Sequence, residues 1–172
     1  MNDTFLPGNG FDTYEEQDRI LMGLSGSVRS GVAVRILQQQ GFAVAAAVVR
    51  LADTPEEHAA AEAAKALAKK LDVECLALNA EALAGQDVEA ARFAALLTAA
   101  DTLGIQYVAS GHYARMETDT QGVSHLFPPE SGAPDESNRL AALSPEVLAR
   151  LILPLGDFAP EDVEDMAEDF KL

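Results

Sequence analysis

The segment RILMGLSGSVRSGVAVRILQQQ, residues 19–40, decides the fold that this sequence predicts. Its first six residues are mostly apolar and predict a buried strand, whereas Val28, Val32 and Ile36 recur at the four-residue spacing of a helix. Between the two lies the serine- and glycine-rich turn SGSVRSG, residues 25–31. Nucleotide-binding folds hold phosphate at such a turn, because the first N–H groups of the helix lack intrahelical partners and carry a partial positive charge. The segment therefore favours an anion site at residues 25–31.

The alternation of strand and helix continues along the chain. Apolar stretches at 42–49, 73–78 and 105–110 predict further strands, and residues 55–71 and 88–103 predict the helices that connect them. Such alternation is typical of right-handed crossovers in a parallel sheet that is covered on both faces. We therefore predict an α/β fold of three layers, α/β/α, with a mainly parallel, Rossmann-like sheet.

The domain organisation follows from composition and regularity. At 172 residues and 48% hydrophobic content, the chain has the size and composition of one globular domain. Residues 1–18 are polar and acidic and predict an N-terminal arm, and residues 19–172 predict the domain itself. Towards its carboxyl end the sequence predicts, in order, a hairpin at 114–128, an exposed polar loop at 129–139, a helix at 144–152 and a helix that begins at Pro160.

Charge and cysteine content restrict the function. The net charge of −16 argues against a chain that binds nucleic acid through its own phosphate contacts, since those contacts need clustered Lys and Arg. The single cysteine, Cys75, cannot form an intramolecular disulfide, and a reducing, cytoplasmic location is expected. No stretch approaches the ~20 apolar residues of a membrane helix, and no spacing of His, Cys, Asp or Glu is typical of a metal site.

Four motifs match those of one known family. SGSVRS, residues 25–30, is similar to the pyrophosphate-binding loop Ser-Gly-Gly-x-Asp-Ser, and VASGHYAR, residues 108–115, to Ala-Thr-Gly-His-Tyr-Ala-Arg. The family's first helix end and second strand start are similar to ILQQQGF, residues 36–42. Its Leu-Phe-Pro-Leu-Gly stretch and the helix that follows are similar to residues 151–169, which begin with LILPLG. In these motifs the chain resembles the adenine nucleotide alpha-hydrolase (PP-loop) superfamily, and within it the tRNA-specific 2-thiouridylase family. The resemblance covers most of residues 19–170 and implies a HUP-type nucleotide-binding domain.

The resemblance also implies roles for individual residues. It implies an ATP or AMP site, and His112, Asp135 and Glu136 fall at family positions that are candidates for contact with RNA or another substrate. The residues that it places around the nucleotide are Gly23, Leu24, Ser25, Gly26, Ser27, Val28, Arg29, Ser30, Val49 and Gly111.

Two departures from the family loop change what the site is expected to do. Ser27 replaces the second glycine and Arg29 replaces the aspartate. Arg29 either pairs with a bound phosphate or sulfate, or points to solvent, or folds across the pocket. The first family cysteine would fall near residues 84–87, which contain no sulfur, and the second belongs to a segment that has no counterpart here. We therefore assign no catalytic residue and expect a non-thiolating homologue.

Two other functions stay open from the sequence. One is an active adenylating or sulfur-transfer subunit of tRNA modification that a partner protein completes. The other is a non-catalytic interaction protein, such as a homodimer, in which Leu148 and residues 151–153 are either an interface or core. Direct binding of tRNA by this chain alone is not expected, because of the net acidity.

Overall fold

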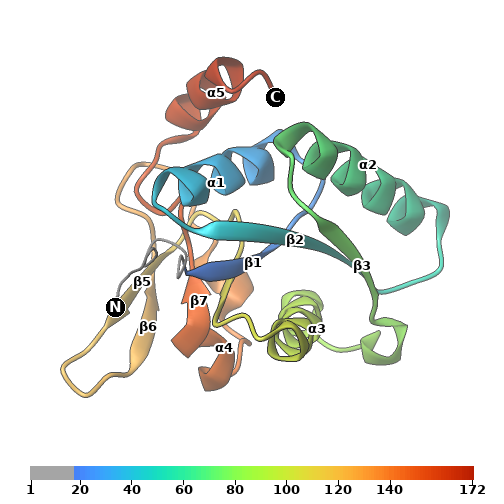
Figure 1. The fold of residues 1–172 in the computed structure, drawn as a ribbon. Helices are drawn as coiled ribbons and strands as arrows, with labels where there is room; N and C mark the ends of the chain where they lie inside the picture. The colour runs from blue at the N-terminus through green and yellow to red at the C-terminus, as the bar shows by residue number, and fades with distance from the viewer. Residues whose placement is uncertain (1–17) are drawn as a thin grey trace, which may run out of the picture.

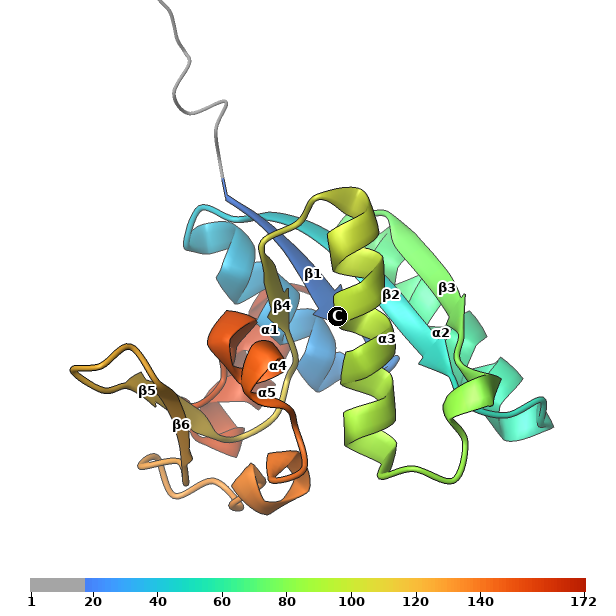
Figure 2. The same cartoon turned by 90° about the horizontal axis from the view of Figure 1, so that it is seen from below.

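The computed structural model describes residues 18–172 and confirms the predicted α/β fold. The predicted arm at 1–18 lies outside these residues except for Asp18. Five parallel strands form one sheet in the order β3-β2-β1-β4-β7; β7 is labelled in Figure 1 and β4 in Figure 2. Their bounds are β1 Arg19–Gly23, β2 Ala43–Arg50, β3 Cys75–Asn79, β4 Tyr107–Ala109 and β7 Leu151–Ile152.

Helices cover both faces of the sheet, which makes the predicted three layers (Figures 1 and 2). One face carries α1 (Val28–Gln39) and α2 (Pro55–Leu71), with α5 (Pro160–Asp169) packed on α1. The other face carries α3 (Val88–Leu103) and α4 (Pro145–Arg150). Within residues 18–172, no helix combines the length and the apolar character that crossing a membrane requires.

The core has two parts, one on each side of the sheet. Successive side chains of a strand point to opposite faces, and accordingly Ile20 and Met22 pack with α1 and α2 whereas Leu21 packs towards α3. All three side chains are fully buried. Leu148 and residues 151–153, which the sequence left open as interface or core, pack against these two clusters.

The carboxyl-terminal half departs from the sequence prediction in one strand. The helix predicted at 144–152 ends at Arg150, and the next two residues form β7, in which Leu151 lies opposite Val108 of β4. The open edge of β4 offers backbone partners to these residues, and Pro154 restricts the residue before it to extended conformations, so the helix cannot continue.

A hairpin and two 3-10 turns complete the structure. The predicted hairpin is present as β5 (Arg115–Thr118) and β6 (Ser124–Phe127). The 3-10 turn η2 (Glu81–Leu83) precedes α3. The loop predicted at 129–139 runs into a second 3-10 turn, η3 (Ser137–Leu140), whose last side chain is fully buried. The sequence analysis missed this buried residue, Leu140, because a run of polar residues precedes it.

Candidate functional site

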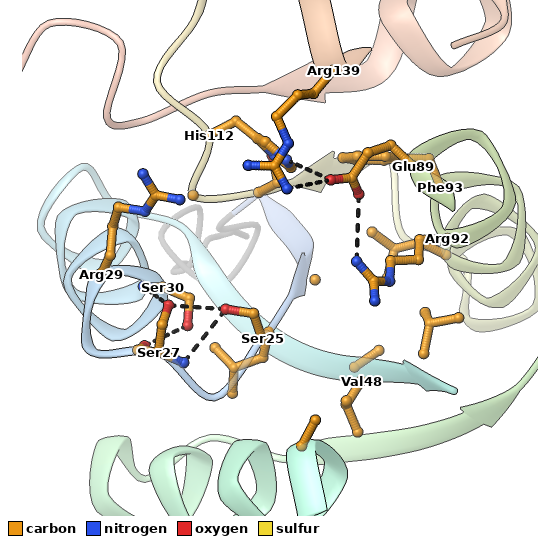
Figure 3. Close-up of a pocket in the computed structure, with 18 of the residues that line it drawn as sticks. Ser25, Ser27, Arg29, Ser30, Val48, Glu89, Arg92, Phe93, His112 and Arg139 are labelled. Carbon is orange, nitrogen blue, oxygen red and sulfur yellow. Dashed lines mark hydrogen bonds and ion pairs between the residues drawn. The ribbon is translucent and has the colours of Figure 1, made fainter. Parts of the chain in front are cut away.

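A cavity of about 300 Å³ opens at the carboxyl ends of β1, β2 and β4 (Figure 3). This is the edge of a parallel sheet where ligands bind, because helix N-termini converge there. Loop 25–31 and α1 form one wall, α2 another and α3 a third, and the segment after β4 lies against the first turn of α1. Of the residues proposed from the sequence, those that line the cavity are Gly23, Leu24, Ser25, Ser27, Arg29, Ser30, Val49, Gly111 and His112.

The loop is built around the start of α1. Ser27 is the N-cap, and its hydroxyl accepts from the backbone N–H of Ser30 at 3.3 Å. The hydroxyls of Ser25 and Ser27 lie 2.9 Å apart. The backbone N–H groups of Val28 and Arg29 have no acceptor among residues 18–172. These are the donors that a helix N-terminus offers to an anion.

Gly26 fixes the path of the loop although it does not line the cavity. Its φ of +84° lies in the left-handed region that side chains disfavour. A Cβ at this position would also meet the Cβ of Ala63 at 3.0 Å and the backbone nitrogen of Ala64 at 3.2 Å. Both the backbone conformation and the lack of space for a side chain therefore require glycine here. The absence of a side chain lets the loop pack directly against α2.

Arg29 is held at the edge of the cavity by residues from distant parts of the chain. Its Nη1 lies 3.2 Å from Oε1 of Glu136, and its guanidinium stacks over the ring of Tyr113 at 4.6 Å from the centroid. The side chain is one-third exposed. None of the three orientations that the sequence left open is found: Arg29 pairs with an acid of the protein at the edge of the cavity, and the cavity stays open (Figure 3).

Glu136 and Asp135 differ in their surroundings. Glu136 is largely buried, accepts from the backbone N–H of Tyr113 at 2.8 Å, and pairs with Arg139 at 3.1 Å as well as with Arg29. Asp135 is exposed and accepts from the hydroxyl and backbone N–H of Ser137. It does not line the cavity, and only Glu136 connects to the loop.

The wall opposite the loop contains a buried acid that the sequence analysis missed. Glu89, only 8% exposed, accepts from Nε2 of His112 at 2.9 Å and from Nη2 of Arg139 at 3.4 Å. Arg92 lies 3.8 Å from its other oxygen. The second ring nitrogen of His112, Nδ1, lies 2.7 Å from the hydroxyl of Ser110. All five side chains line the cavity.

Two opposing effects set the charge of Glu89. Burial raises the pKa of a carboxyl group, but the hydrogen bond and charge of His112, together with Arg92 and Arg139, outweigh it and hold the pKa of Glu89 below its ordinary value. Glu89 is therefore a carboxylate at neutral pH and can only accept hydrogen bonds.

The spacing of residues along α3 is the sequence feature that places Glu89 on the buried face of the helix. Glu89, Phe93, Leu96 and Ala100 recur on one helical face, and all four are buried. An acid on the apolar face of an amphipathic helix is either paired or functional. The sequence alone did not distinguish it from an ordinary first-turn glutamate.

Cys75 lies away from this cavity. It is the first residue of β3, whereas the cavity lies at the carboxyl ends of the strands. The thiol is half-buried, and burial raises its pKa above the ordinary value. Among residues 18–172, no three His, Cys, Asp or Glu side chains are grouped as metal ligands.

Known proteins similar to this chain modify tRNA. The tRNA-specific 2-thiouridylase MnmA of Yersinia pestis is 33% identical over 184 residues, and that of Streptococcus thermophilus 30% identical over 183 residues. Each alignment covers 91% of this chain and 49% of the relative. The chain thus spans about half the length of the curated relatives it matches.

Solved structures agree on the fold. The U34-tRNA thiolase NcsA from Methanococcus maripaludis superimposes with a TM-score of 0.62 at 16% identity, over 90% of this chain and 57% of that one. A predicted subunit of tRNA methyltransferase from Methanocaldococcus jannaschii does so with a TM-score of 0.53 at 16% identity, over 88% and 74% of the two chains.

A family model covers the carboxyl-terminal half of the chain. The model described as the tRNA methyl transferase HUP domain matches residues 84–172, more than half of the sequence. Its match includes α3, the segment after β4 and η3, all of which contribute residues to the cavity. The protein therefore belongs to the tRNA methyl transferase HUP domain family and is related, over most of its length, to the tRNA-specific 2-thiouridylases.

Proposed function

We propose that this chain is a nucleotide-binding domain of the 2-thiouridylase type that holds ATP or AMP by its phosphates at residues 25–31 and does not itself transfer sulfur. The observation that carries the proposal is the position of the loop. It follows the central strand β1, opens α1, and presents the free N–H groups of Val28 and Arg29 beside a cavity. Phosphate at a helix N-terminus is stabilised by those donors and by the helix dipole.

The rest of the cavity supports a nucleotide in preference to a simple ion. A cavity of about 300 Å³ lies at the small end of the range that organic ligands use. Ala47 and Val48 of β2 and Phe93 and Leu96 of α3 give it an apolar part next to the polar loop. A ligand with one apolar ring and one anionic end matches this division.

The position of the thiol supports the absence of sulfur transfer. Sulfur relay through a protein needs a reactive thiolate next to the bound substrate. Cys75 is the only cysteine of the 172 residues, and it lies at the far end of β3, four residues before the strand ends. At a rise of about 3.3 Å per residue, that is ~13 Å from the edge where the cavity opens.

Calorimetry on a variant that lacks one backbone N–H group of the loop tests the binding proposal. ATP, AMP and pyrophosphate are titrated separately into the wild type and into Val28→Pro. Val28 is the first residue of α1 and Ser27 is already extended, so proline fits the backbone and removes only the N–H group. A hydrogen bond to a charged group is worth about 1.5–3 kcal/mol, so pyrophosphate binding should weaken roughly tenfold or more.

The chain offers a matched control for this variant. Val88 is the first residue of α3 and is 50% exposed compared with 46% for Val28, but it lies outside the loop at residues 25–31. Val88→Pro should bind like the wild type. Absence of heat for all three ligands at millimolar concentration would end the proposal.

A second candidate is an adenylating or sulfur-transfer subunit that a partner protein completes. The observation that favours it is His112, an acid–base group that two hydrogen bonds hold in the cavity wall. This candidate predicts release of AMP or pyrophosphate from ATP once acceptor and partner are present. Unchanged ATP under those conditions argues against it.

A further inference from the structure

Three side chains in the cavity wall form a continuous hydrogen-bonded row. Ser110 follows β4, His112 follows two residues later, and Glu89 comes from the first turn of α3. The Ser110 Oγ to His112 Nδ1 distance is 2.7 Å, and the His112 Nε2 to Glu89 Oε2 distance is 2.9 Å. Ser110 is 5% and Glu89 8% exposed, so both groups are shielded from bulk water except through the cavity.

The charge of Glu89 determines which ring nitrogen of His112 carries hydrogen. Because Glu89 is a carboxylate, it accepts from His112, and Nε2 of the ring therefore carries hydrogen. In the neutral ring, Nδ1 is then an acceptor and faces the Ser110 hydroxyl. A hydroxyl beside a base that a carboxylate orients is the arrangement that activates a nucleophile.

We propose that Ser110 is a nucleophile, with His112 as its general base and Glu89 as the positioning residue, and that the cavity accepts an acyl ester that carries an anionic group. The proposal goes beyond nucleotide binding and does not depend on it. The two nitrogens of the imidazole exchange the roles that they have in serine proteases, but the order of hydroxyl, base and acid is the same.

The reaction balances without a metal or a redox partner. Ser110 Oγ bonds to the carbonyl carbon of the ester while its proton moves to His112 Nδ1. The bond from that carbon to the leaving oxygen breaks, and the leaving alcohol takes the proton from Nδ1. Water then attacks the acyl-serine by the same route and releases the acid. Glu89 stabilises the imidazolium that forms in both steps.

Donors for the developing oxyanion are at hand. The backbone N–H groups of Gly111 and His112 have no acceptor among residues 18–172. Gly111 packs on the first turn of α1, since a Cβ there would lie 3.4 Å from Cα of Ser30. The reacting carbonyl would thus lie near the positive end of α1, which stabilises negative charge.

Arg92 is the reason for proposing an anionic group on the substrate. It lies one turn along α3 from Glu89, lines the cavity, and keeps a side chain that is 41% exposed. Within residues 18–172 its ion-pair partner is Glu89, at the long distance of 3.8 Å, so most of its donors are free for a ligand. A guanidinium binds carboxylate or phosphate oxygens through two parallel hydrogen bonds.

Labelling with a fluorophosphonate, which forms an Oγ–P bond and releases fluoride, tests the nucleophile directly. The folded full-length chain should be labelled on Ser110, as read by peptide mass spectrometry. Ser110→Ala should remove the label, and His112→Asn should slow labelling roughly 100-fold, the usual contribution of a general base. The matched control is Ser124→Ala, a serine in β6 away from the cavity, which should label like the wild type.

Glu89 needs a measurement that a purely structural role would not change. Glu89→Gln should slow labelling at least about tenfold, and the double variant with His112→Asn should be no slower than His112→Asn alone. Thermal denaturation identifies variants that do not fold. The proposal would be overturned if the folded wild type were not labelled or if Ser110→Ala were still labelled. It would also be overturned if the double variant were slower than His112→Asn by the full factor that Glu89→Gln causes alone. Loss of labelling would leave nucleotide binding, measured by calorimetry, untouched.

Discussion

Arg29 and Glu136, 107 residues apart in the sequence, form an ion pair with 3.2 Å between Nη1 and Oε1. The pair ties the start of α1 to the segment before η3, and it gives the guanidinium an acceptor other than a ligand. Glu136→Gln should therefore strengthen pyrophosphate binding. An interaction of about 1 kcal/mol corresponds to a roughly fivefold change in the dissociation constant, which calorimetry resolves.

The control for this variant is Glu161→Gln, the same charge change in the exposed first turn of α5. It should leave the affinity for pyrophosphate within about twofold of the wild type, because separate surface charges are screened over ~8 Å in physiological salt. Equal effects in the two variants would show that net charge, and not the release of Arg29, governs binding.

Gly26 offers a test of how tightly the loop is fixed. Gly26→Ala should lower the free energy of unfolding by about 2–4 kcal/mol, because left-handed backbone costs roughly 1–2 kcal/mol and the contact with Ala63 adds an overpacking penalty. Gly122→Ala is the control, since its φ is +82° but nothing lies within 4 Å of its Cβ. Urea unfolding should separate the two variants, and similar losses would mean that the contact with α2 yields easily.

The buried acid predicts a pH dependence of stability. The pKa of Glu89 is lowered in the folded protein from an ordinary value of 4.5, so its ion pairs stabilise the fold above that value and are lost as pH falls through the folded pKa. Glu89→Gln should therefore cost about 1–3 kcal/mol of unfolding free energy at pH 7, and progressively less as the pH falls below the ordinary pKa of 4.5 and through the folded pKa. Urea titrations of both proteins across this range measure the difference. A gap that stays constant with pH would mean that Glu89 is not charged in the fold.

Cys75 provides a test of the proposal that this chain does not transfer sulfur. Cys75→Ala should leave the affinities for ATP and pyrophosphate within about twofold of wild type, because the thiol lies at the opposite end of β3 from the cavity. The raised pKa of this thiol also predicts slow alkylation by iodoacetamide at pH 7, since the thiolate is the reactive form. Loss of nucleotide binding in this variant would contradict the assigned position of the site.

The fold was predictable from residues whose periodicity is local. Val28, Val32 and Ile36 identified α1. The helix predicted at 55–71 is present with the same bounds as α2, where Pro55 is the first residue and the Thr54 hydroxyl accepts from Glu57 N–H. These signals depend on neighbours within one or two turns, and tertiary packing reinforced them.

Features that depend on distant partners were not predictable. β7 exists because the edge of β4 accepts two residues that follow α4. The row through Glu89, His112 and Ser110 joins positions up to 23 residues apart, and the Arg29–Glu136 pair joins positions much farther apart. In the sequence, each of these residues has the pattern of an ordinary surface or helix-end residue. Its partner becomes visible only in the three-dimensional structure.

The position of β1 at the centre of the sheet affects how this domain can evolve. Its three consecutive fully buried residues supply the packing of both core layers, whereas the groups that face the cavity come from the loops beyond the strand ends. Most of the packing in the core thus comes from residues other than those that give the cavity its chemical character. Many side chains at the rim can therefore change while β1 and its packing stay the same, and such a scaffold can take up new reactions by substitutions around its cavity.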